Sequence, residues 1–232
     1  MKVAIMQPYF FPYIGYWQLL NAVDKYVIYD DVNYIKGGWI NRNKILLNRK
    51  AELINLQTYK ASPNKRINEI ETLGNDVYNN KLLKKIESAY IKSPFFEDVF
   101  PIIIKIINQN ERNLSKYLTF SIREVCKYLN IDTQIMLSSD ISKNNALRSQ
   151  KRVIEICKLL KAEQYINPIG GIELYSKQDF ALQGIQLNFL KSNDIVYQQF
   201  KNEFVQNLSI IDVMMFNSKE DIARLLLKYD LS

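Results

Sequence analysis

Side chains that can carry out chemistry are concentrated in the first 43 positions of the chain, after two predicted strands at residues 2–6 and 26–29. α/β folds bind their ligands at the carboxyl ends of strands. We therefore expect the active or binding site in this part of the chain. The candidate residues are Gln7, Tyr9, Tyr13, Gly15, Tyr16, Asp30, Asp31, Lys36, Trp39, Asn41, Arg42 and Asn43.

Three of these residues are candidates for catalysis. Asp30 and Asp31 end the second strand, where adjacent side chains point to opposite faces, so at most one of them faces the ligand. That carboxylate would act as a general base or would bind a substrate hydroxyl or amine, while the other caps or pairs with a neighbour. Tyr13 is the third candidate, because a neutral tyrosine can donate a hydrogen bond or stack on a base.

The remaining candidates suit binding. Gln7 leaves a buried strand and can offer donor and acceptor together to a base or a carboxamide. Arg42 can clamp a phosphate or a carboxylate with two parallel hydrogen bonds. Asn41 and Asn43 would add hydrogen bonds, and Trp39 would provide a stacking wall. A solvated charged loop over residues 36–44 is the alternative.

A second glycine-bearing turn follows a predicted strand at residues 164–167. Glycines permit positive φ or close backbone approach, and the amides of such a turn can cradle an anion. A purely structural turn is the alternative. This turn and the one after the first strand would open at the same edge of the sheet and face each other across a crevice. The turn after residues 164–167 adds four candidate binding residues, which are Asn167, Gly170, Gly171 and Tyr175.

The composition excludes several kinds of chemistry. The 232 residues include no histidine, which removes Ser-His-Asp and Cys-His catalysis. Cys126 and Cys157 lie far apart in helical patterns, so we expect reduced thiols and no zinc or other soft-metal site, while a magnesium ion bound by Asp30 or Asp31 is left open. The formal charge of +7 suits a phosphorylated small molecule as well as a nucleic acid, and no nucleic-acid-binding motif supports the latter. No apolar run is long enough for a membrane span, and we expect a cytoplasmic protein.

Alternating strands and helices predict an α/β fold with a parallel, doubly wound sheet of the Rossmann or nucleotidyltransferase type. We expect a single α/β domain over residues 1–232, with a helical insertion or subdomain at about 67–130. Residues 51–57 are predicted to form a third strand. A carboxylate in an apolar helix usually needs a partner, so Asp212 is predicted to pair with an arginine such as Arg42.

Six segments, taken in order, resemble the WbqC-like protein family over nearly the whole chain. They are QPYFFPYIGYWQLL, YDD, WINRNKI, YINPIGGIELY, GIQLNF and LSIIDVMMFNS. The resemblance implies a bacterial protein whose relatives are encoded among genes for O-antigen and other surface polysaccharides, often near sugar aminotransferases.

The tetrapeptide Tyr13-Ile14-Gly15-Tyr16 also resembles the HIGH-type motif of adenylyl-transferring enzymes, which opens a helix after the first strand. In those enzymes the glycine lets the backbone approach the nucleotide, and the histidines stabilise charge on the phosphates. Tyrosine stands at both histidine positions here and cannot supply an imidazolium charge. The likeness therefore implies a nucleotide-binding fold more strongly than it implies adenylyl transfer.

The residues alone support a small phosphorylated ligand in an α/β crevice. With the resemblance, the expected function is N-acyl or aminoacyl transfer to a nucleotide-linked amino sugar, which requires an acyl or aminoacyl donor. A non-catalytic scaffold that binds a glycan or a pathway enzyme is one alternative. The other is an adenylate-forming ligase that uses ATP and magnesium. The sequence leaves a homo-oligomer open.

Overall fold

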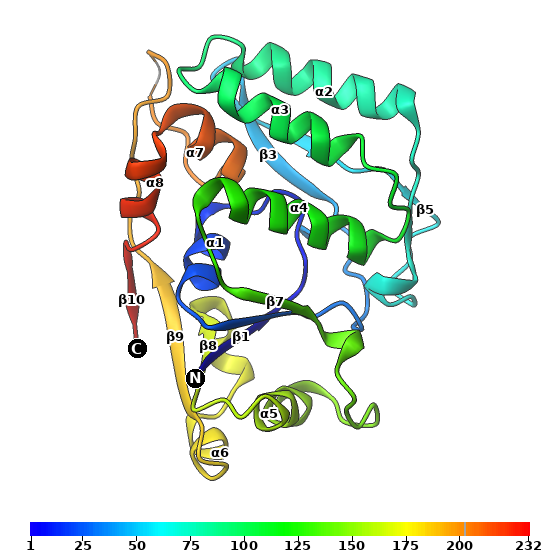
Figure 1. The fold of residues 1–232 in the computed structure, drawn as a ribbon, viewed down its shortest axis with the longest axis vertical. Helices are drawn as coiled ribbons and strands as arrows, with labels where there is room; N and C mark the ends of the chain where they lie inside the picture. The colour runs from blue at the N-terminus through cyan, green and yellow to red at the C-terminus, as the bar shows by residue number, and fades with distance from the viewer. Residues whose placement is uncertain (202) are drawn as a thin grey trace.

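The computed structural model describes residues 1–201 and 203–232, which form a mixed α/β fold around a mostly parallel sheet of six strands (Figure 1). The strand order is β10-β9-β8-β1-β2-β7, and only β10 runs antiparallel to its neighbour. The strands are β1 (Lys2–Met6), β2 (Lys25–Ile28), β7 (Gln134–Leu137), β8 (Gln164–Pro168), β9 (Gln186–Ser192) and β10 (Tyr229–Leu231).

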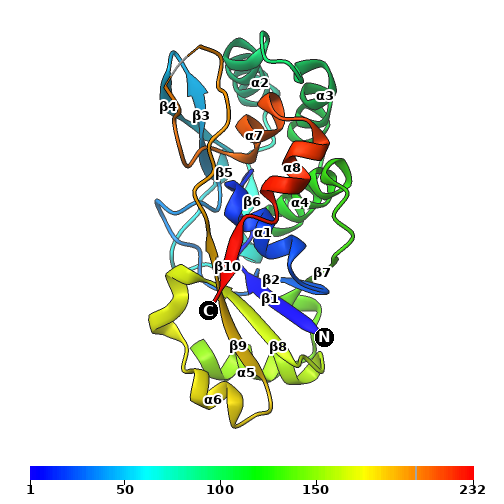
Figure 2. The ribbon, with the colours of Figure 1, turned by 90° about the vertical axis from the view of Figure 1, so that its left-hand side faces the viewer.

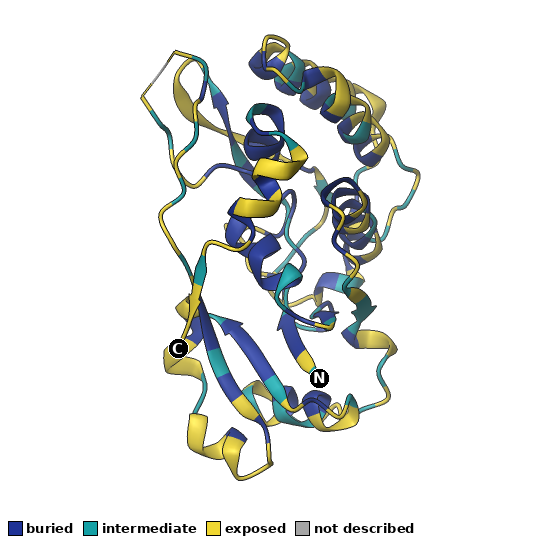
Figure 3. Cartoon of the chain, turned by 60° about the vertical axis from the view of Figure 1, so that its left-hand side comes forward, coloured by how far each residue is buried: buried dark blue, intermediate teal, exposed yellow. Residues whose placement is uncertain are grey.

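Helices cover both faces of this sheet (Figures 1 and 2). Val3 and Ile5 of β1 pack in one core cluster with α5 and α6, whereas Ala4 joins a second cluster with the helices on the opposite face. A strand buried on both faces must be apolar throughout, which explains the sequence VAI. Buried residues run through the strands and the inner faces of the helices (Figure 3). The bounds are α1 (Ile14–Asn21), α5 (Ser149–Leu159), α6 (Lys177–Ala181), α7 (Ile210–Phe216) and α8 (Lys219–Leu225).

The segment between β2 and β7 carries most of the second core cluster. Its long helices are α2 (Asp76–Tyr90), α3 (Phe96–Ile107) and α4 (Leu114–Leu129). The short strands β5 (Thr58–Tyr59) and β6 (Glu71–Thr72) pair just before them. Residues of all three long helices belong to the cluster that also contains Ala4 and Ile28 of the sheet, so the helices share a core with it.

The third strand predicted at 51–57 is present as β4 (Lys50–Asn55), whereas the loop predicted for residues 36–44 needs correction. From Arg42 the chain is a strand, β3 (Arg42–Leu47), and it pairs antiparallel with β4 outside the central sheet. Asn48 and Arg49 connect them with φ of 51° and 64°, the left-handed pair that a tight hairpin turn requires. Ile45 and Ile54 turn toward the core, which holds the hairpin in place.

The order of the strands reverses between β1 and β8. From β1 the chain continues to β2 and β7 on one side, and it later returns to β8 and β9 on the other side. The connections after neighbouring parallel strands diverge at such a point and leave a crevice at the carboxyl ends. The turns that begin at Gln7 and Ile169 therefore lie at the same edge of the sheet, as the sequence predicts.

Candidate functional site

The backbone conformation of the turn after β1 is fixed by side chains from distant elements. Phe11 has a φ of 42°, a conformation that a non-glycine residue adopts only when its surroundings fix it. Asn43 Nδ2 donates to the carbonyl oxygens of Phe10 and Phe11 at 3.1 and 2.8 Å, and Ser209 Oγ donates to Phe11 O at 2.8 Å. The Asn43 amide predicted to bind ligand therefore shapes the turn instead.

Tyr13 caps the start of α1, and its ring lies over the first turn of that helix. It is 43% exposed, and burial of the rest of the side chain raises the pKa of its hydroxyl. Gly15 makes room for the ring, because a β-carbon there would stand 2.3 Å from Tyr13 Oη. Tyr16 is buried and donates to Gln7 O at 3.2 Å, so it supports the turn from below.

Two hollows meet at Tyr13. The first, of about 320 Å³, lies where α1 begins and where β8 and β9 end. The second, of about 450 Å³, lies between the β1 turn and the β3 strand. Tyr13 and Asn207 line both hollows. The first is lined by Tyr13, Ile14, Ile169, Lys191, Ser192, Asn193, Asp194, Ile195, Tyr197, Phe204, Gln206, Asn207, Leu208 and Val213. The second is lined by Tyr9, Pro12, Tyr13, Trp39, Asn43, Lys44 and Asn207.

Trp39 forms an exposed aromatic wall of the second hollow, flanked by two cations. Arg42 Cζ and Lys44 Nζ lie 5.7 and 5.8 Å from the Trp39 ring centroid. Arg42 is already engaged, since its Nε donates to Gly38 O at 2.9 Å and its Nη2 donates to Gly37 O. Arg42 thus braces its own loop, where the sequence predicts an open phosphate clamp, and Lys44 is the cation that lines the hollow.

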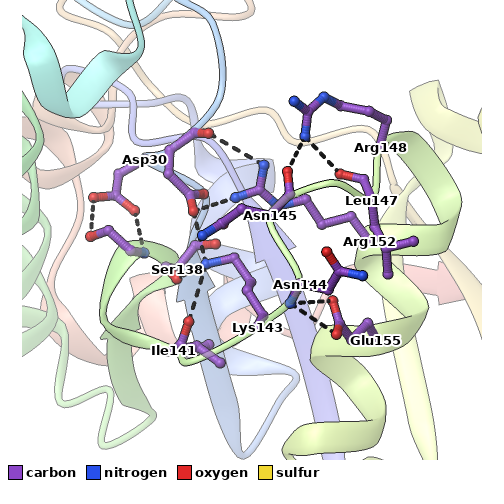
Figure 4. A network of polar contacts seen from close by, with 12 residues as sticks. Asp30, Ser138, Ile141, Lys143, Asn144, Asn145, Leu147, Arg148, Arg152 and Glu155 are labelled. Carbon is purple, nitrogen blue, oxygen red and sulfur yellow. Dashed lines mark hydrogen bonds and ion pairs between the residues drawn. The ribbon is translucent and has the colours of Figure 1, made fainter.

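Asp30 is buried and fully engaged at the end of β2. Its Oδ1 accepts from Ser139 N at 3.0 Å, and its Oδ2 accepts from the hydroxyls of Ser139 and Ser115 at 2.7 and 3.1 Å. The carboxylate joins the end of β2 to α4 through Ser115 and to the segment after β7 through Ser139. Figure 4 shows Asp30 beside Ser138 of that segment. These donors leave the Asp30 carboxylate in no position to act as the general base that the sequence predicts.

Asp31 points to the other side and forms a buried ion-pair cluster. Its Oδ2 lies 2.8 Å from Lys143 Nζ and also accepts from Arg152 Nη2, and both cations are buried (Figure 4). Burial disfavours ionisation, but Lys143, Ser138 and Arg152 outweigh it and hold the pKa of Asp31 below its usual 3.8. Asp31 therefore fixes residues 138–152 against the end of β2. It has the structural role predicted for one of the two carboxylates.

The turn after β8 is built around Asn167. The Asn167 amide accepts from Tyr165 Oη and donates to Pro168 O, both at 3.0 Å. A β-carbon on Gly171 would stand 2.1 Å from Asn167 Nδ2, so this glycine is needed for close approach. Gly170 has open space around it, and Tyr175 packs edge-on against Tyr165. Asn167, Gly171 and Tyr175 thus contribute to packing beneath the crevice, while Gly170 faces outward.

The other predicted side chains are either partly or fully exposed or hold neighbouring segments in place. Tyr9 is half-buried against Tyr16 at the second hollow, with its pKa raised by burial and by Tyr13. Gln7 is half-buried and Lys36 is exposed. Asn41 accepts from Tyr34 Oη at 2.7 Å and donates to Leu56 O at 3.0 Å, so it ties the loop to the residue that follows β4.

The prediction that Asp212 pairs with an arginine is wrong. Its carboxylate accepts from Tyr90 Oη at 2.8 Å, and from Tyr197 Oη and Gln199 Nε2 at 2.6 Å each. Burial raises the pKa of Asp212 although the three donors oppose it. Neutral donors therefore replace the expected cation, and the group anchors α7 to α2 and to the segment after β9.

Several residues that line the hollows were missed as candidates. Lys191, Ser192, Asn193 and Asp194 follow the apolar part of β9, as the polar residues after β1 follow that strand. Searching for polar residues at strand ends would have found them. Lys44 lies in the charged loop predicted at 36–44, where the sequence favours Arg42 as the anion-binding cation. Asn207 carries no such signal, because the segment 203–209 reaches the site only through tertiary packing.

Comparisons with known proteins identify the family to which the chain belongs. No solved structure matches it. None of the helices in the described part of the chain has the length and apolar character that a membrane crossing requires. A Mycobacterium tuberculosis (strain ATCC 25618 / H37Rv) protein named "Uncharacterized protein Rv1507c" is 26% identical over 219 residues, which covers 93% of each chain. The WbqC-like protein family matches residues 7–224, as the sequence motifs predict. The chain belongs to the WbqC-like protein family.

Proposed function

We propose that this protein is an enzyme of bacterial surface-glycan biosynthesis that transfers an acyl or aminoacyl group to a nucleotide-linked amino sugar. The observation that carries the proposal is that two hollows of ligand size meet at Tyr13. A transferase must hold a donor and an acceptor so that their reacting atoms meet. The family resemblance supports the glycan context and the choice of an amino sugar.

The first hollow suits the nucleotide. It lies at the carboxyl ends of β8 and β9 beside Ile14 at the start of α1, the position where parallel α/β folds bind nucleotides and where helix amides attract phosphate. Lys191 adds a positive charge. The nucleotide would lie here, with its sugar directed toward Tyr13.

Transfer joins the amine nitrogen of the sugar to the carbonyl carbon of the donor and breaks the bond between that carbon and its leaving group. The amine proton must go to a base, and Asp194 is the carboxylate that lines the first hollow. Tyr13 has a raised pKa and stays protonated at neutral pH, so its hydroxyl would donate to the developing oxyanion. Asp194 thus takes the role predicted for Asp30 or Asp31.

A mass-spectrometric screen tests this function by combining nucleotide-linked amino sugars with acyl and aminoacyl donors. We expect an N-acylated product, and we expect Tyr13→Phe and Asp194→Asn each to lower turnover by about 10²-fold or more. Tyr78→Phe, at an exposed tyrosine of α2, is the matched control and should turn over normally. No product from any pair, or full activity of both site variants, would reject the proposal.

The motif at Tyr13 to Tyr16 favours a second candidate, an adenylate-forming ligase, because it opens a helix after the first strand as the HIGH-type motif does. Calorimetric titration separates the candidates. Binding of nucleotide sugar without ATP supports the transferase, and binding of ATP with magnesium supports the ligase. Binding of neither would favour a non-catalytic scaffold. Gln7→Ala should weaken binding if the strand exit contacts the nucleotide.

A further inference from the structure

We propose that the second hollow binds a ring-bearing small molecule through an anionic group, a carboxylate or a phosphate, which Lys44 neutralises while the ring stacks on Trp39. Trp39 and Tyr13 are 42% and 43% exposed, although both line this hollow. The other tryptophan, Trp17, is fully buried. A pair of large aromatic side chains facing an open hollow of about 450 Å³ is suited to the apolar face of a sugar-sized ring.

The charge requirement comes from Lys44. This lysine is half-buried on β3, and among the residues that the structure describes no carboxylate lies within 4 Å of its ammonium. The Trp39 face at 5.8 Å provides only partial compensation for the lost hydration. A ligand anion would supply the missing partner. The nearby Arg42 guanidinium donates to carbonyl oxygens of its own loop. Lys44 is therefore the cation that would pair with the negative charge of the ligand.

The backbone around both residues is already fixed. Ser209 N donates to Lys44 O at 2.8 Å, and Phe10 N donates to Trp39 O at 3.3 Å. Lys44 N also donates to the neighbouring Asn43 side chain at 2.8 Å. Little ordering of the main chain is therefore needed when a ligand enters, which favours binding. Tyr9 and Asn207 supply a hydroxyl and an amide along the same wall for the polar groups of the ring.

The inference rests on the proposed function only in making this ligand the acyl or aminoacyl donor, because Tyr13 also lines the hollow assigned to the nucleotide-linked sugar. Binding in the second hollow is measurable without turnover. A protein that binds the anion but forms no product would leave this inference intact and reject the transferase. A protein that forms product but binds no anion in the second hollow would support the transferase and reject this inference.

Tryptophan fluorescence tests the proposal, since Trp39 is the exposed one of the two tryptophans. Glucuronate and glucose 1-phosphate serve as the carboxylate and phosphate probes, and methyl glucoside serves as the neutral probe. We expect saturable quenching by at least one charged probe, with affinity about tenfold or more weaker for Lys44→Met and recovered by Lys44→Arg. Whichever charged probe binds more tightly identifies the anion. Trp39→Phe should abolish the signal.

Lys50→Met, at an exposed lysine of the same hairpin, is the matched control and should bind as the unaltered protein does. If Lys44→Met does not fold, rising salt should weaken binding of the charged probe to the unaltered protein and leave the neutral probe unaffected. Equal affinity for neutral and charged probes, unchanged affinity in Lys44→Met, or no binding of any probe would overturn the proposal.

Discussion

The ring of Tyr13 covers the backbone of Gly15, so closely that a β-carbon on Gly15 would stand 2.3 Å from the Tyr13 hydroxyl oxygen. Gly15 is helical, and its backbone does not require glycine. The requirement comes from the side chain two residues earlier. This contact fixes Tyr13 at the junction of the two hollows, where its hydroxyl can reach both proposed ligands.

Gly15→Ala should therefore fold but lose ligand binding. Alanine favours a helix by about 1 kcal/mol over glycine, and the exposed Tyr13 ring can swing aside. We expect an unchanged or slightly raised melting temperature and an affinity for nucleotide sugar reduced about tenfold or more, measured by calorimetry. In a Tyr13→Ala background the same change should have no further effect on affinity. Equal binding by Gly15→Ala and the unaltered protein would contradict the role of this contact.

The two glycines after β8 should respond differently to alanine. A β-carbon at Gly171 would meet Asn167 Nδ2 at 2.1 Å and displace the amide that accepts from Tyr165, whereas a β-carbon at Gly170 would extend into open space. We expect Gly171→Ala to lower the free energy of unfolding by about 1–3 kcal/mol, and Gly170→Ala to change it by about 0.5 kcal/mol or less. Urea denaturation measures both. Similar losses for the two variants would contradict the close approach.

Asp31→Asn should destabilise the protein in a pH-dependent manner. At neutral pH the variant leaves Lys143 and Arg152 buried without their carboxylate, which costs about 3–5 kcal/mol. The folded-state pKa of Asp31 is lowered, so its contribution is present above the usual pKa of 3.8 and is lost as pH falls through the folded value. The difference in unfolding free energy between unaltered protein and variant should therefore shrink at acid pH.

Denaturant unfolding of both proteins between pH 7 and pH 3 measures this difference. Asp132→Asn, at an exposed aspartate, is the control and should show no comparable change. A gap between unaltered protein and Asp31→Asn that stays constant over this range would show that the ion pair is not its source.

Tyr90→Phe should weaken the packing of α7 against the hairpin. The hydroxyl of Tyr90 donates to Asp212 at 2.8 Å and accepts from Leu46 N at 2.9 Å, and all three groups are buried. Its removal leaves a buried amide and a carboxylate short of partners, and we expect a loss of about 1–3 kcal/mol. Thermal and urea unfolding check this value. Tyr78→Phe should be neutral, and an equal effect of the two changes would refute the network.

Continuous apolar runs made the central strands predictable. The strands at Lys2–Met6 and Gln134–Leu137 lie where predicted. Burial on both faces requires the apolar run of the first strand, whereas the second is a half-buried edge strand that carries the apolar run Ile135–Leu137. Strand β3 escaped prediction because Asn43 occupies its buried face, satisfied by two carbonyl oxygens more than 30 residues away. No local pattern reveals such a partner.

The candidate site was also predictable only where local sequence patterns determine it. Its location was predictable, since Tyr13 and Gly15 follow the first strand at the edge where the strand order reverses. The roles of Asp30 and Asp31 were not, because their partners Ser139 and Arg152 lie more than 100 positions later. A carboxylate at a strand end looks the same in the sequence whether it faces a ligand or a buried cation.

The hairpin that carries Lys44, with Trp39 just before it, stands outside the six-stranded sheet and contributes no strand to it. Substitutions on its solvent-facing side would leave the register of the sheet and the β1 turn unchanged. Descendants of this chain could therefore exchange one small-molecule preference for another by mutating this appendage alone. Protein engineers have the same route, since randomising only the solvent-facing positions of the hairpin, with Asn43 kept, would vary recognition while the nucleotide end of the crevice stays constant.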